Sequence, residues 1–386
     1  AYQRMNTGLY IHIPYCLQKC RYCDFFSVAQ RENTDAFVSA LHREIELSPS
    51  LLPEGTMVPS VFFGGGTPTV LPAEMLAALL THIKAAFTLQ PDAEITLECN
   101  PGTAGPEALA VLRKAGFNRL SLGLQSTEDD LLHSIGRIHD YTAFLRAFQA
   151  ARQAGFANIN VDLMHGLPGQ SQESYLASLK KVCDLGPEHI SAYCLILEEG
   201  TPLYGDVQAG RIILPDPDAV ADMEDAGMAY LESRGYGRYE ISNFARPGYA
   251  CRHNLLYWNN QPYLGLGPGA HSSLPGKDGW ERWYNPANIP GYLRSLNADH
   301  LPRGEIQRLS PREERFETVM LGLRKVEGLS LAEFENRFGE KLPAAFPKAF
   351  RQIDEYGWWA VCPGRAALNR RGLDMLNEAL VLFMEE

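Results

Sequence analysis

Short apolar runs alternate with longer amphipathic segments through the first half of the chain. Six apolar runs have the length and the β-branched content of strands. They cover residues 9–13, 60–65, 93–99, 119–125, 157–164 and 189–196. Most follow the previous run after about 30 residues, the usual size of a strand–helix–strand unit. Since parallel neighbouring strands need crossover helices, the alternation predicts a parallel α/β sheet.

The segments between these strands carry helix start and stop signals. Pro72 and Pro106 each open an amphipathic segment, while Gly116 and Gly155 stand where a helix would be capped at its C-terminus. Six strands are fewer than a closed (β/α)8 barrel requires. The pattern alone therefore fits both a curved, incomplete barrel and an open sheet.

The pattern changes after residue 200 and again after residue 308. Residues 201–308 are rich in glycine, proline and aromatic residues, with one clear helix over 217–235, and we expect them to extend the first part. The rest is mostly helical, with a short predicted hairpin at 358–369. Helices followed by a small hairpin indicate a winged-helix-like module. We therefore predict three domains, 1–200, 201–308 and 309–386.

Composition narrows the range of partners. The chain has 386 residues, a formal net charge of −11 and a pI near 5.5, which disfavours binding of nucleic acid or anionic lipid. We therefore expect the C-terminal module to pack against the rest of the chain or to bind protein. No run of about 18 apolar residues predicts a transmembrane segment. No signal-peptide pattern begins the chain, so the sequence predicts a cytoplasmic location.

Three of the eight cysteines are clustered. Cys16, Cys20 and Cys23 follow the first strand, at the edge of a parallel sheet where ligands bind. Structural zinc usually takes four ligands, and neither a second cysteine pair nor a histidine at matching distance is present. Three thiolates on a four-iron cluster leave one iron with an open coordination position. The spacing indicates a metal or cluster site, with buried or redox-active thiols as the alternative.

The segments "YCLQKCRYC" at 15–23 and "VFFGGGTPT" at 61–69 resemble the radical S-adenosylmethionine (SAM) superfamily. The resemblance implies an incomplete (β/α)6 barrel and a [4Fe-4S] cluster held by the three cysteines. It also implies that the methionine end of SAM completes the open iron, and that reduction of the sulfonium yields a 5'-deoxyadenosyl radical. The protein would position, shield and tune the cluster.

The same resemblance implies which residues hold SAM. Gly65, Gly66 and Thr67 would lie against the methionine amino group. Other polar residues would hold the ribose, the carboxylate and nearby groups, and two tyrosines would pack around the cluster and adenine. These are Glu98, Gln125, Arg137 and Asp162, with Tyr10 and Tyr22. Taken alone, each polar residue is equally compatible with an ordinary buried, hydrogen-bonded side chain. The inference therefore rests on the occurrence of all of them, in this order, along the chain.

Further motifs resemble the branch of the superfamily that contains the oxygen-independent coproporphyrinogen III oxidase. They are "YIHIPYC", "GRIH", "DLMHGLPGQ" and "GLGPGAHS", and together they span most of residues 9–275. Two departures argue against oxidase activity. The oxidase has a further cysteine where this chain has Phe25, and it has a longer segment before the first strand.

The segment "CRHNLLYW" at 251–258 contains an H-N-x-x-Y-W pattern formed by His253, Asn254, Tyr257 and Trp258. It resembles the signature of the haem chaperones of this branch, which implies that His253 binds haem iron as an axial ligand. Aromatic rings nearby offer apolar faces to the macrocycle. The alternative is a histidine in a hydrogen-bonded turn beside core aromatics. His271, between small residues in "GAHS", is expected to serve a turn or the cofactor end of the sheet rather than to bind haem.

Together these observations predict a haem chaperone with a radical SAM core. Its cofactors would be a [4Fe-4S] cluster, S-adenosylmethionine and haem, and its partner would be an acceptor haemoprotein such as a respiratory enzyme. The alternative is an oxygen-independent coproporphyrinogen III oxidase or a related radical SAM enzyme that acts on a porphyrin. A third class, a zinc-binding or partner-binding module, predicts zinc in place of iron.

Overall fold

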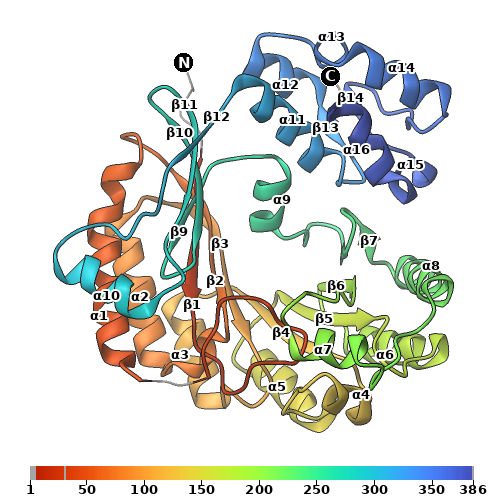
Figure 1. Ribbon diagram of the computed structural model, residues 1–386. Helices are drawn as coiled ribbons and strands as arrows, with labels where there is room; N and C mark the ends of the chain where they lie inside the picture. Colours follow the sequence, from red (N-terminus) through yellow and green to blue (C-terminus); the bar gives the residue numbers. More distant parts are fainter. Residues whose placement is uncertain (1–5, 30–31, 385–386) are drawn as a thin grey trace.

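The computed structural model describes residues 6–29 and 32–384, and its main feature is a large curved sheet (Figure 1). All six predicted strands form, and they pair in parallel and in chain order. They are β1 (Gly8–Ile13), β2 (Val58–Gly65), β3 (Leu89–Cys99), β4 (Arg119–Gln125), β5 (Ile159–His165) and β6 (His189–Cys194). The prediction of a parallel α/β sheet is confirmed.

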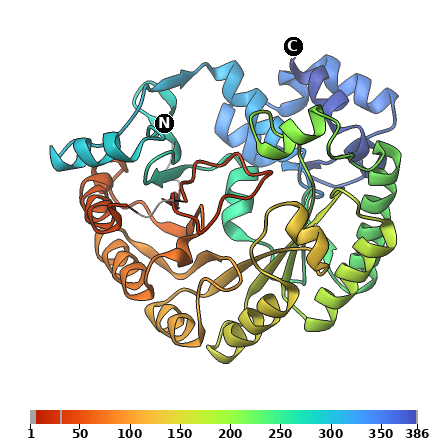
Figure 2. The same cartoon turned by 60° about the horizontal axis from the view of Figure 1, so that its bottom comes forward.

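Helices surround the outer side of these strands, and the loop that carries the cysteines crosses the open face (Figure 2). Pro72 directly precedes one helix and Pro106 begins the next, while Gly116 ends that helix at a φ of 118° that favours glycine. The outer elements are α1 (Thr34–Leu47), η1 (Ser48–Leu51), η2 (Pro68–Val70), α2 (Ala73–Ala86), α3 (Pro106–Ala115), α4 (Asp129–Ser134), α5 (Tyr141–Gln153) and α6 (Gln172–Leu185).

The sheet continues beyond both edges of the six strands, which the apolar pattern did not predict. Next to β1 the order is β9 (Tyr263–Leu266), β10 (His271–Gly276), β11 (Gly279–Tyr284) and β12 (Gln307–Leu309). Next to β6 it is β8 (Asn243–Ala245) and β7 (Gly237–Arg238). Within the described residues β12 and β7 end the sheet without pairing to each other. The incomplete barrel is confirmed.

Strand β4 shows how the sequence builds both the core and the site. All seven of its residues are buried. Leu120, Leu122 and Leu124 belong to the main apolar core, together with residues of the outer helices. Ser121 and Gln125 point to the inner face, because successive side chains of a strand alternate. In this buried strand the apolar side chains lie on the face that the helices cover, and the polar side chains of Ser121 and Gln125 lie on the face that lines a cavity.

Four helices belong to the chain between the six parallel strands and the C-terminal module. They are α7 (Pro202–Gln208), α8 (Pro217–Ser233), α9 (Arg252–Trp258) and α10 (Ile289–Asn297). Helix α8 confirms the helix predicted over 217–235. No helix in the described ranges combines the length and the apolar character needed to cross a membrane.

The C-terminal module has its own apolar core, which includes Val319, Phe334 and Ile353. Residues 358–369 form the predicted narrow hairpin, with a bridge between Trp359 and Leu368. One arm of the hairpin also pairs with a short strand outside it. The elements are α11 (Pro311–Gly322), β13 (Leu329–Ser330), α12 (Leu331–Phe338), α13 (Leu342–Ala345), α14 (Pro347–Glu355), β14 (Arg365–Ala366), α15 (Arg370–Asp374) and α16 (Leu376–Met384).

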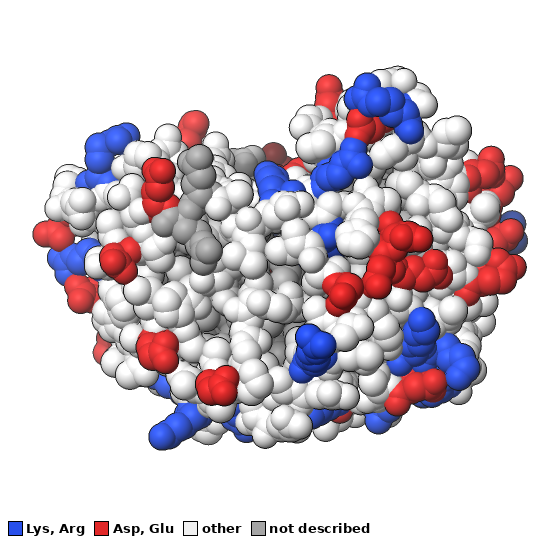
Figure 3. All heavy atoms as spheres, turned by 90° about the horizontal axis from the view of Figure 1, so that it is seen from below, with Lys and Arg blue, Asp and Glu red and all other residues white. Residues whose placement is uncertain are grey.

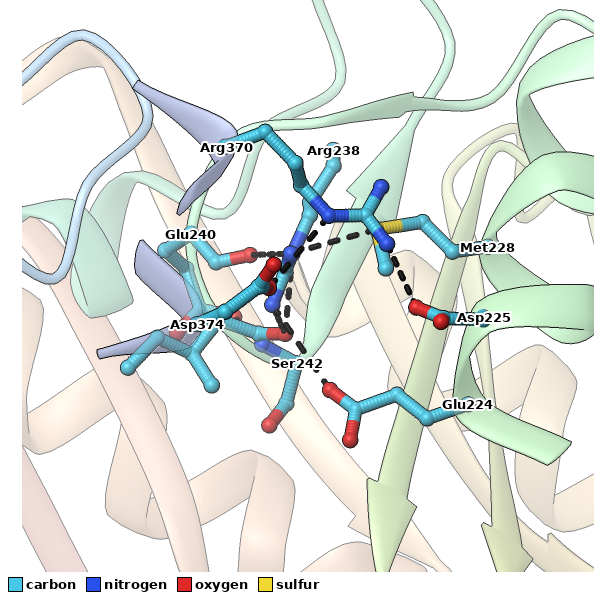
Figure 4. Close-up of polar contacts among 9 residues, drawn as sticks. Glu224, Asp225, Met228, Arg238, Glu240, Ser242, Arg370 and Asp374 are labelled. Carbon is cyan, nitrogen blue, oxygen red and sulfur yellow. Dashed lines mark hydrogen bonds and ion pairs between the residues drawn. The ribbon is translucent and has the colours of Figure 1, made fainter. Parts of the chain in front are cut away.

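Two arginines lie where this module meets the sheet domain (Figure 4). Arg238 donates from Nε and Nη2 to the Ile241 carbonyl, at 3.1 and 2.7 Å, and its side chain is 9% exposed. Arg370 of α15 pairs with Asp225 of α8 at 2.5 Å, but both side chains are at least half exposed. Water can therefore replace the exposed ion pair of Arg370, but it has little access to the hydrogen bonds of Arg238.

We expect Arg238→Ala to lower the free energy of unfolding by about 2 kcal/mol, because it leaves buried carbonyl groups without donors. The matched change Arg370→Ala removes an exposed ion pair and should cost less than about 1 kcal/mol. Chemical denaturation followed by tryptophan fluorescence measures both. Equal losses for the two variants would contradict this assignment.

Candidate functional site

The cysteine-bearing loop between β1 and α1 is fixed at both of its ends. The Cys16 N–H donates to the Val28 carbonyl at 3.0 Å, and the Val28 N–H donates to the Pro14 carbonyl at 2.7 Å. Tyr15 and Val28 also form a parallel bridge. The three cysteines are thus carried by a closed loop that begins where β1 ends.

Arg21, in the middle of the cysteine loop, connects the loop to segments on the opposite side of the open face. Its N–H donates to the Ile135 carbonyl at 3.0 Å, and its carbonyl accepts from the Leu203 N–H at 2.9 Å. Its guanidinium forms an ion pair with Asp206 of α7. These contacts join the loop to the segments that follow β4 and β6.

A cavity of about 190 Å³ lies between this loop and the inner face of the sheet; we call it the cofactor cavity. All the residues predicted for the cluster and SAM line it, with the exception of Tyr10. They are Cys16, Cys20, Tyr22, Cys23, Gly65, Gly66, Thr67, Glu98, Gln125, Arg137 and Asp162. Most come from the cysteine loop and from the carboxyl ends of β2, β3 and β4, where parallel sheets bind ligands. Asp162 lies in the middle of β5, and Arg137 follows helix α4.

Gly66 packs directly against the cysteine loop. A Cβ at this position would lie 2.5 Å from the Tyr15 carbonyl oxygen and 2.9 Å from the Cys16 Sγ. The Gly66 N–H donates to the Ile13 carbonyl at 2.8 Å. The glycine therefore allows the loop after β2 to approach a predicted ligand of the cluster, which any side chain would prevent.

A chain of hydrogen bonds crosses the cavity wall. Thr67 Oγ1 accepts from Asn100 Nδ2 at 2.8 Å and lies 3.8 Å from the Cys16 Sγ, and Asn100 Oδ1 accepts from Arg137 at 3.1 Å. Arg137 Nε is buried and has no hydrogen-bond partner in the described part of the chain. It is a donor available to an anionic group in the cavity, such as the carboxylate of an amino acid.

The sequence analysis did not predict every residue of this wall, and Asn100 and Tyr193 are two that it missed. Tyr193 donates from its hydroxyl to Gln125 Oε1 at 2.8 Å, and Gln125 has a φ of 74°, which is unusual outside glycine. Asn100 and Tyr193 lie at or just after the end of a parallel strand, β3 or β6. Their position at the carboxyl ends of strands was the available signal.

Two carboxyl groups face the cavity in a poorly hydrated environment. Burial, with the neighbouring Asp162 adding to it, raises the pKa of Glu98 to about 8, while the Gly65 N–H opposes the shift. Burial also raises the pKa of Asp162, although Asn160 Nδ2 donates to it at 2.7 Å. A ligand with hydroxyl or ammonium donors would stabilise the charged form of both carboxyl groups by donating hydrogen bonds to them.

The three thiols line the cavity without converging on one point. Among residues 6–29 and 32–384, no three His, Cys, Asp or Glu side chains are grouped as ligands of a single metal ion. The donor set of three thiols, the close approach of Gly66 and the free Nε of Arg137 fit a cluster with bound SAM.

Tyr10 lines a second cavity of about 570 Å³, which we call the aromatic cavity. Phe25 lines both cavities. The aromatic cavity also contains His12 and His271. Its aromatic rings are Tyr10, Phe25, Phe26, Tyr257, Tyr263 and Tyr284.

His253 belongs to the first turn of helix α9, and its side chain is 1% exposed. Its Nδ1 is 2.8 Å from the Ser60 hydroxyl and its Nε2 is 2.9 Å from the Tyr257 hydroxyl. Glu94 of β3 accepts from the backbone N–H groups of Arg252 and His253 and so caps the helix. His253 therefore has no free ring nitrogen, and the predicted bond to haem iron requires one of these contacts to break.

The other residues of the H-N-x-x-Y-W pattern point in different directions. The Asn254 N–H contacts the Cys251 thiol, and Tyr257 faces the aromatic cavity. Trp258 lines a third cavity of about 830 Å³, between α9 and helices α11 and α12. Its Nε1 is buried without a hydrogen-bond partner among the described residues. Helix α9 thus separates two cavities.

Figure 3 shows the molecule from below the view of Figure 1. Uncharged side chains cover much of the middle of this face, and charged ones are more frequent toward its margin. No extended field of lysine and arginine is visible on this face, as expected from the net charge of −11.

Residues 10–182 match the Radical SAM superfamily and residues 309–375 match the HemN C-terminal domain. The protein named heme chaperone HemW from Bacillus subtilis (strain 168) is 36% identical over 98% of this chain and 99% of its own length. The protein of the same name from Escherichia coli (strain K12) is also 36% identical, over 98% of both chains.

Among solved structures, the chain resembles coproporphyrinogen III oxidase (HemN) from Escherichia coli, which is described as a radical SAM enzyme. The TM-score is 0.83 at 24% identity, over 98% of this chain and 90% of that one. This likeness shows a shared fold.

The curved parallel sheet, with three cysteines and a glycine loop at one cavity, defines a protein of the radical SAM class. Within that class, the similarity to the heme chaperone HemW proteins extends over nearly the full length of the chain and shows the family. The chain belongs to the family of heme chaperone HemW proteins.

Proposed function

We propose that this protein binds a [4Fe-4S] cluster and SAM in the cofactor cavity and acts as a haem chaperone, which takes up haem and delivers it to an acceptor haemoprotein. The observation that carries the proposal is the cofactor cavity itself. Three thiols, a glycine loop in contact with one of them and a free arginine donor meet there. The name of the relatives supports the haem part.

Each group of residues has a distinct part in this proposal. Cys16, Cys20 and Cys23 would hold three irons of the cluster. The loop with Gly65, Gly66 and Thr67 leaves room for the amino group of SAM beside them. Once held, the cluster supplies an iron with an open coordination position and a single electron.

The polar side chains would fix the rest of SAM. The free Nε of Arg137 suits the carboxylate, and Glu98 and Asp162 can accept from ribose hydroxyls. Gln125, held by Tyr193, offers a further amide. The Tyr22 ring lines the same wall and excludes water from it.

Helix α9 supports the haem part of the proposal, because it separates the aromatic cavity from the cavity beside the C-terminal module. Tyr257 and Trp258 each present an aromatic ring to one of them. His253, the iron ligand predicted from the sequence, can take that role only when its Nε2 leaves the Tyr257 hydroxyl.

Anaerobic reconstitution with iron and sulfide, followed by titration with hemin, tests the proposal. We expect cluster absorption that responds to SAM, stoichiometric hemin binding, and transfer of the hemin to an apo-haemoprotein such as apomyoglobin. No carbon dioxide should be released from coproporphyrinogen III under reducing conditions with SAM. Sustained carbon dioxide release, or the absence of hemin binding, would contradict the proposal.

A further inference from the structure

The aromatic cavity has the size and lining of a site for a flat, largely apolar ligand. Its volume of about 570 Å³ lies within the range of about 300–1,000 Å³ that small-molecule sites have. Two of its rings are exposed, Phe25 at 68% and Tyr284 at 53%. Exposed aromatic faces beside a cavity are apolar surface that a planar ligand would cover.

The histidines at this cavity differ in whether a ring nitrogen is free. His12 is hydrogen-bonded through Nδ1 to the Tyr10 hydroxyl at 3.1 Å and through Nε2 to the Phe26 carbonyl at 2.8 Å. His253, behind the cavity wall, has both nitrogens occupied. His271 lines the cavity and is exposed, and within the described ranges neither of its ring nitrogens has a hydrogen-bond partner.

We propose that haem lies in the aromatic cavity and that a ring nitrogen of His271 binds its iron. This inference rests on the proposed haem chaperone function and gives it a binding site. Neutral imidazole is a common axial ligand of haem iron, and the rings around His271 supply apolar contacts for the macrocycle. A turn-forming role, as expected from the sequence, would not require a free nitrogen at an exposed position.

Two features of the surroundings support this site. His271 is only partly covered by protein, yet this partial burial, with the positive charge of Arg282 adding to it, lowers the pKa of its imidazole, which is neutral and able to bind iron at neutral pH. The Lys19 ammonium, which lines the cofactor cavity, donates at 3.1 Å to the carbonyl of Phe25, a residue that both cavities share. A haem propionate can pair with this ammonium.

The site also gives His253 a role that its buried position allows. His253 Nε2 holds the Tyr257 hydroxyl, and the Tyr257 ring packs edge-on against Tyr263, with 4.6 Å between the centroids. Both tyrosines form the cavity wall. His253 is thus a positioning residue for that wall.

Hemin titration of the reconstituted protein, followed by resonance Raman spectroscopy of the ferrous complex, tests the inference. We expect the iron–imidazole stretching band in the wild type and in His253→Gln, and its loss in His271→Gln. The hemin affinity of His271→Gln should fall by about tenfold or more, equivalent to about 1.4 kcal/mol. Free imidazole should restore the band in His271→Gly. His300→Gln, which changes an exposed histidine outside the cavity, is the matched control.

A second variant tests the cavity without changing a histidine. Tyr284→Ser should weaken hemin binding by about fivefold, because one aromatic face is lost, while the iron–imidazole band remains. Cluster content equal to that of the wild type shows that each variant is folded.

Three results would overturn the inference. If His253→Gln loses the band and His271→Gln keeps it, the ligand is His253. If SAM displaces hemin competitively and His271→Gln weakens SAM binding instead, the aromatic cavity takes the adenine. In both cases the chaperone proposal survives. If the wild type binds no hemin, the chaperone proposal itself fails.

Discussion

Cys23→Ala is expected to bring the iron and sulfide content of the reconstituted protein down to background. Each thiolate would hold one iron of the cluster, so the variant leaves a second iron without a protein ligand and open to water. The thiol lies on the wall of the cofactor cavity, and the two other cysteines of the loop, Cys16 and Cys20, would each already hold an iron. Iron and sulfide analysis, with visible absorption before and after addition of SAM, measures the effect.

Cys362→Ala provides the matched control. Cys362 lies in the C-terminal hairpin and is a free cysteine, as Cys23 is. It should retain the iron, the sulfide and the response to SAM. Wild-type levels of iron and sulfide in Cys23→Ala would reject the assignment of the three cysteines as cluster ligands. The argument that one iron has an open coordination position would then fail as well.

Glu44→Ala should lower the free energy of unfolding by about 3 kcal/mol at pH 5, because several buried donors lose their acceptor. Glu44 of α1 accepts from the Gly267 N–H at 2.7 Å, from Asn285 Nδ2 at 2.7 Å and from the Tyr292 hydroxyl at 2.6 Å. It therefore joins the first helix to α10 and to the residues that follow β9 and β11, which lie more than half of the chain away in sequence. Urea denaturation measures the loss.

The same group gives the wild type a pH dependence of stability. Burial raises the pKa of Glu44 from 4.5 to about 7, although its three donors oppose the shift. The native state therefore keeps a proton that the unfolded state releases. The contribution is complete below about pH 4.5 and is lost as the pH rises through about 7, with a total on the order of 3 kcal/mol.

Glu44→Gln separates the charge from the hydrogen bonds. It keeps a side chain of the same shape without a titrating proton, so its stability should change less between pH 5 and pH 8 than that of the wild type. An equal pH dependence in Glu44→Gln and the wild type would show that another group is responsible.

The sequence predicted the parallel core of the fold because local signals specify it. Apolar runs of strand length, Pro106 at a helix start and Gly116 at a helix end act within a few residues, and each appears in the structure at its predicted place. The candidate site residues came from the resemblance to the radical SAM superfamily, and the fold explains why so many of them line one cavity. Once the strands are parallel, their carboxyl ends meet at one edge.

The contacts between distant segments could not be predicted in this way. Glu94 caps a helix that begins 158 residues later, and Glu44 bonds to a tyrosine 248 residues away. The short strands β7 to β12 are stabilised by pairing with the edges of the sheet, and their own sequences carry little strand signal.

The sequence by itself determined that three cysteines lie close together, because they stand in one loop after a strand. Only the tertiary structure decided which side chains are free to bind a ligand. His253 and His271 are both histidines near aromatic residues, yet packing occupies both nitrogens of the first and leaves those of the second free within the described residues. A lone pair is free or occupied according to its neighbours in space, and these come from strands and helices far apart in the chain.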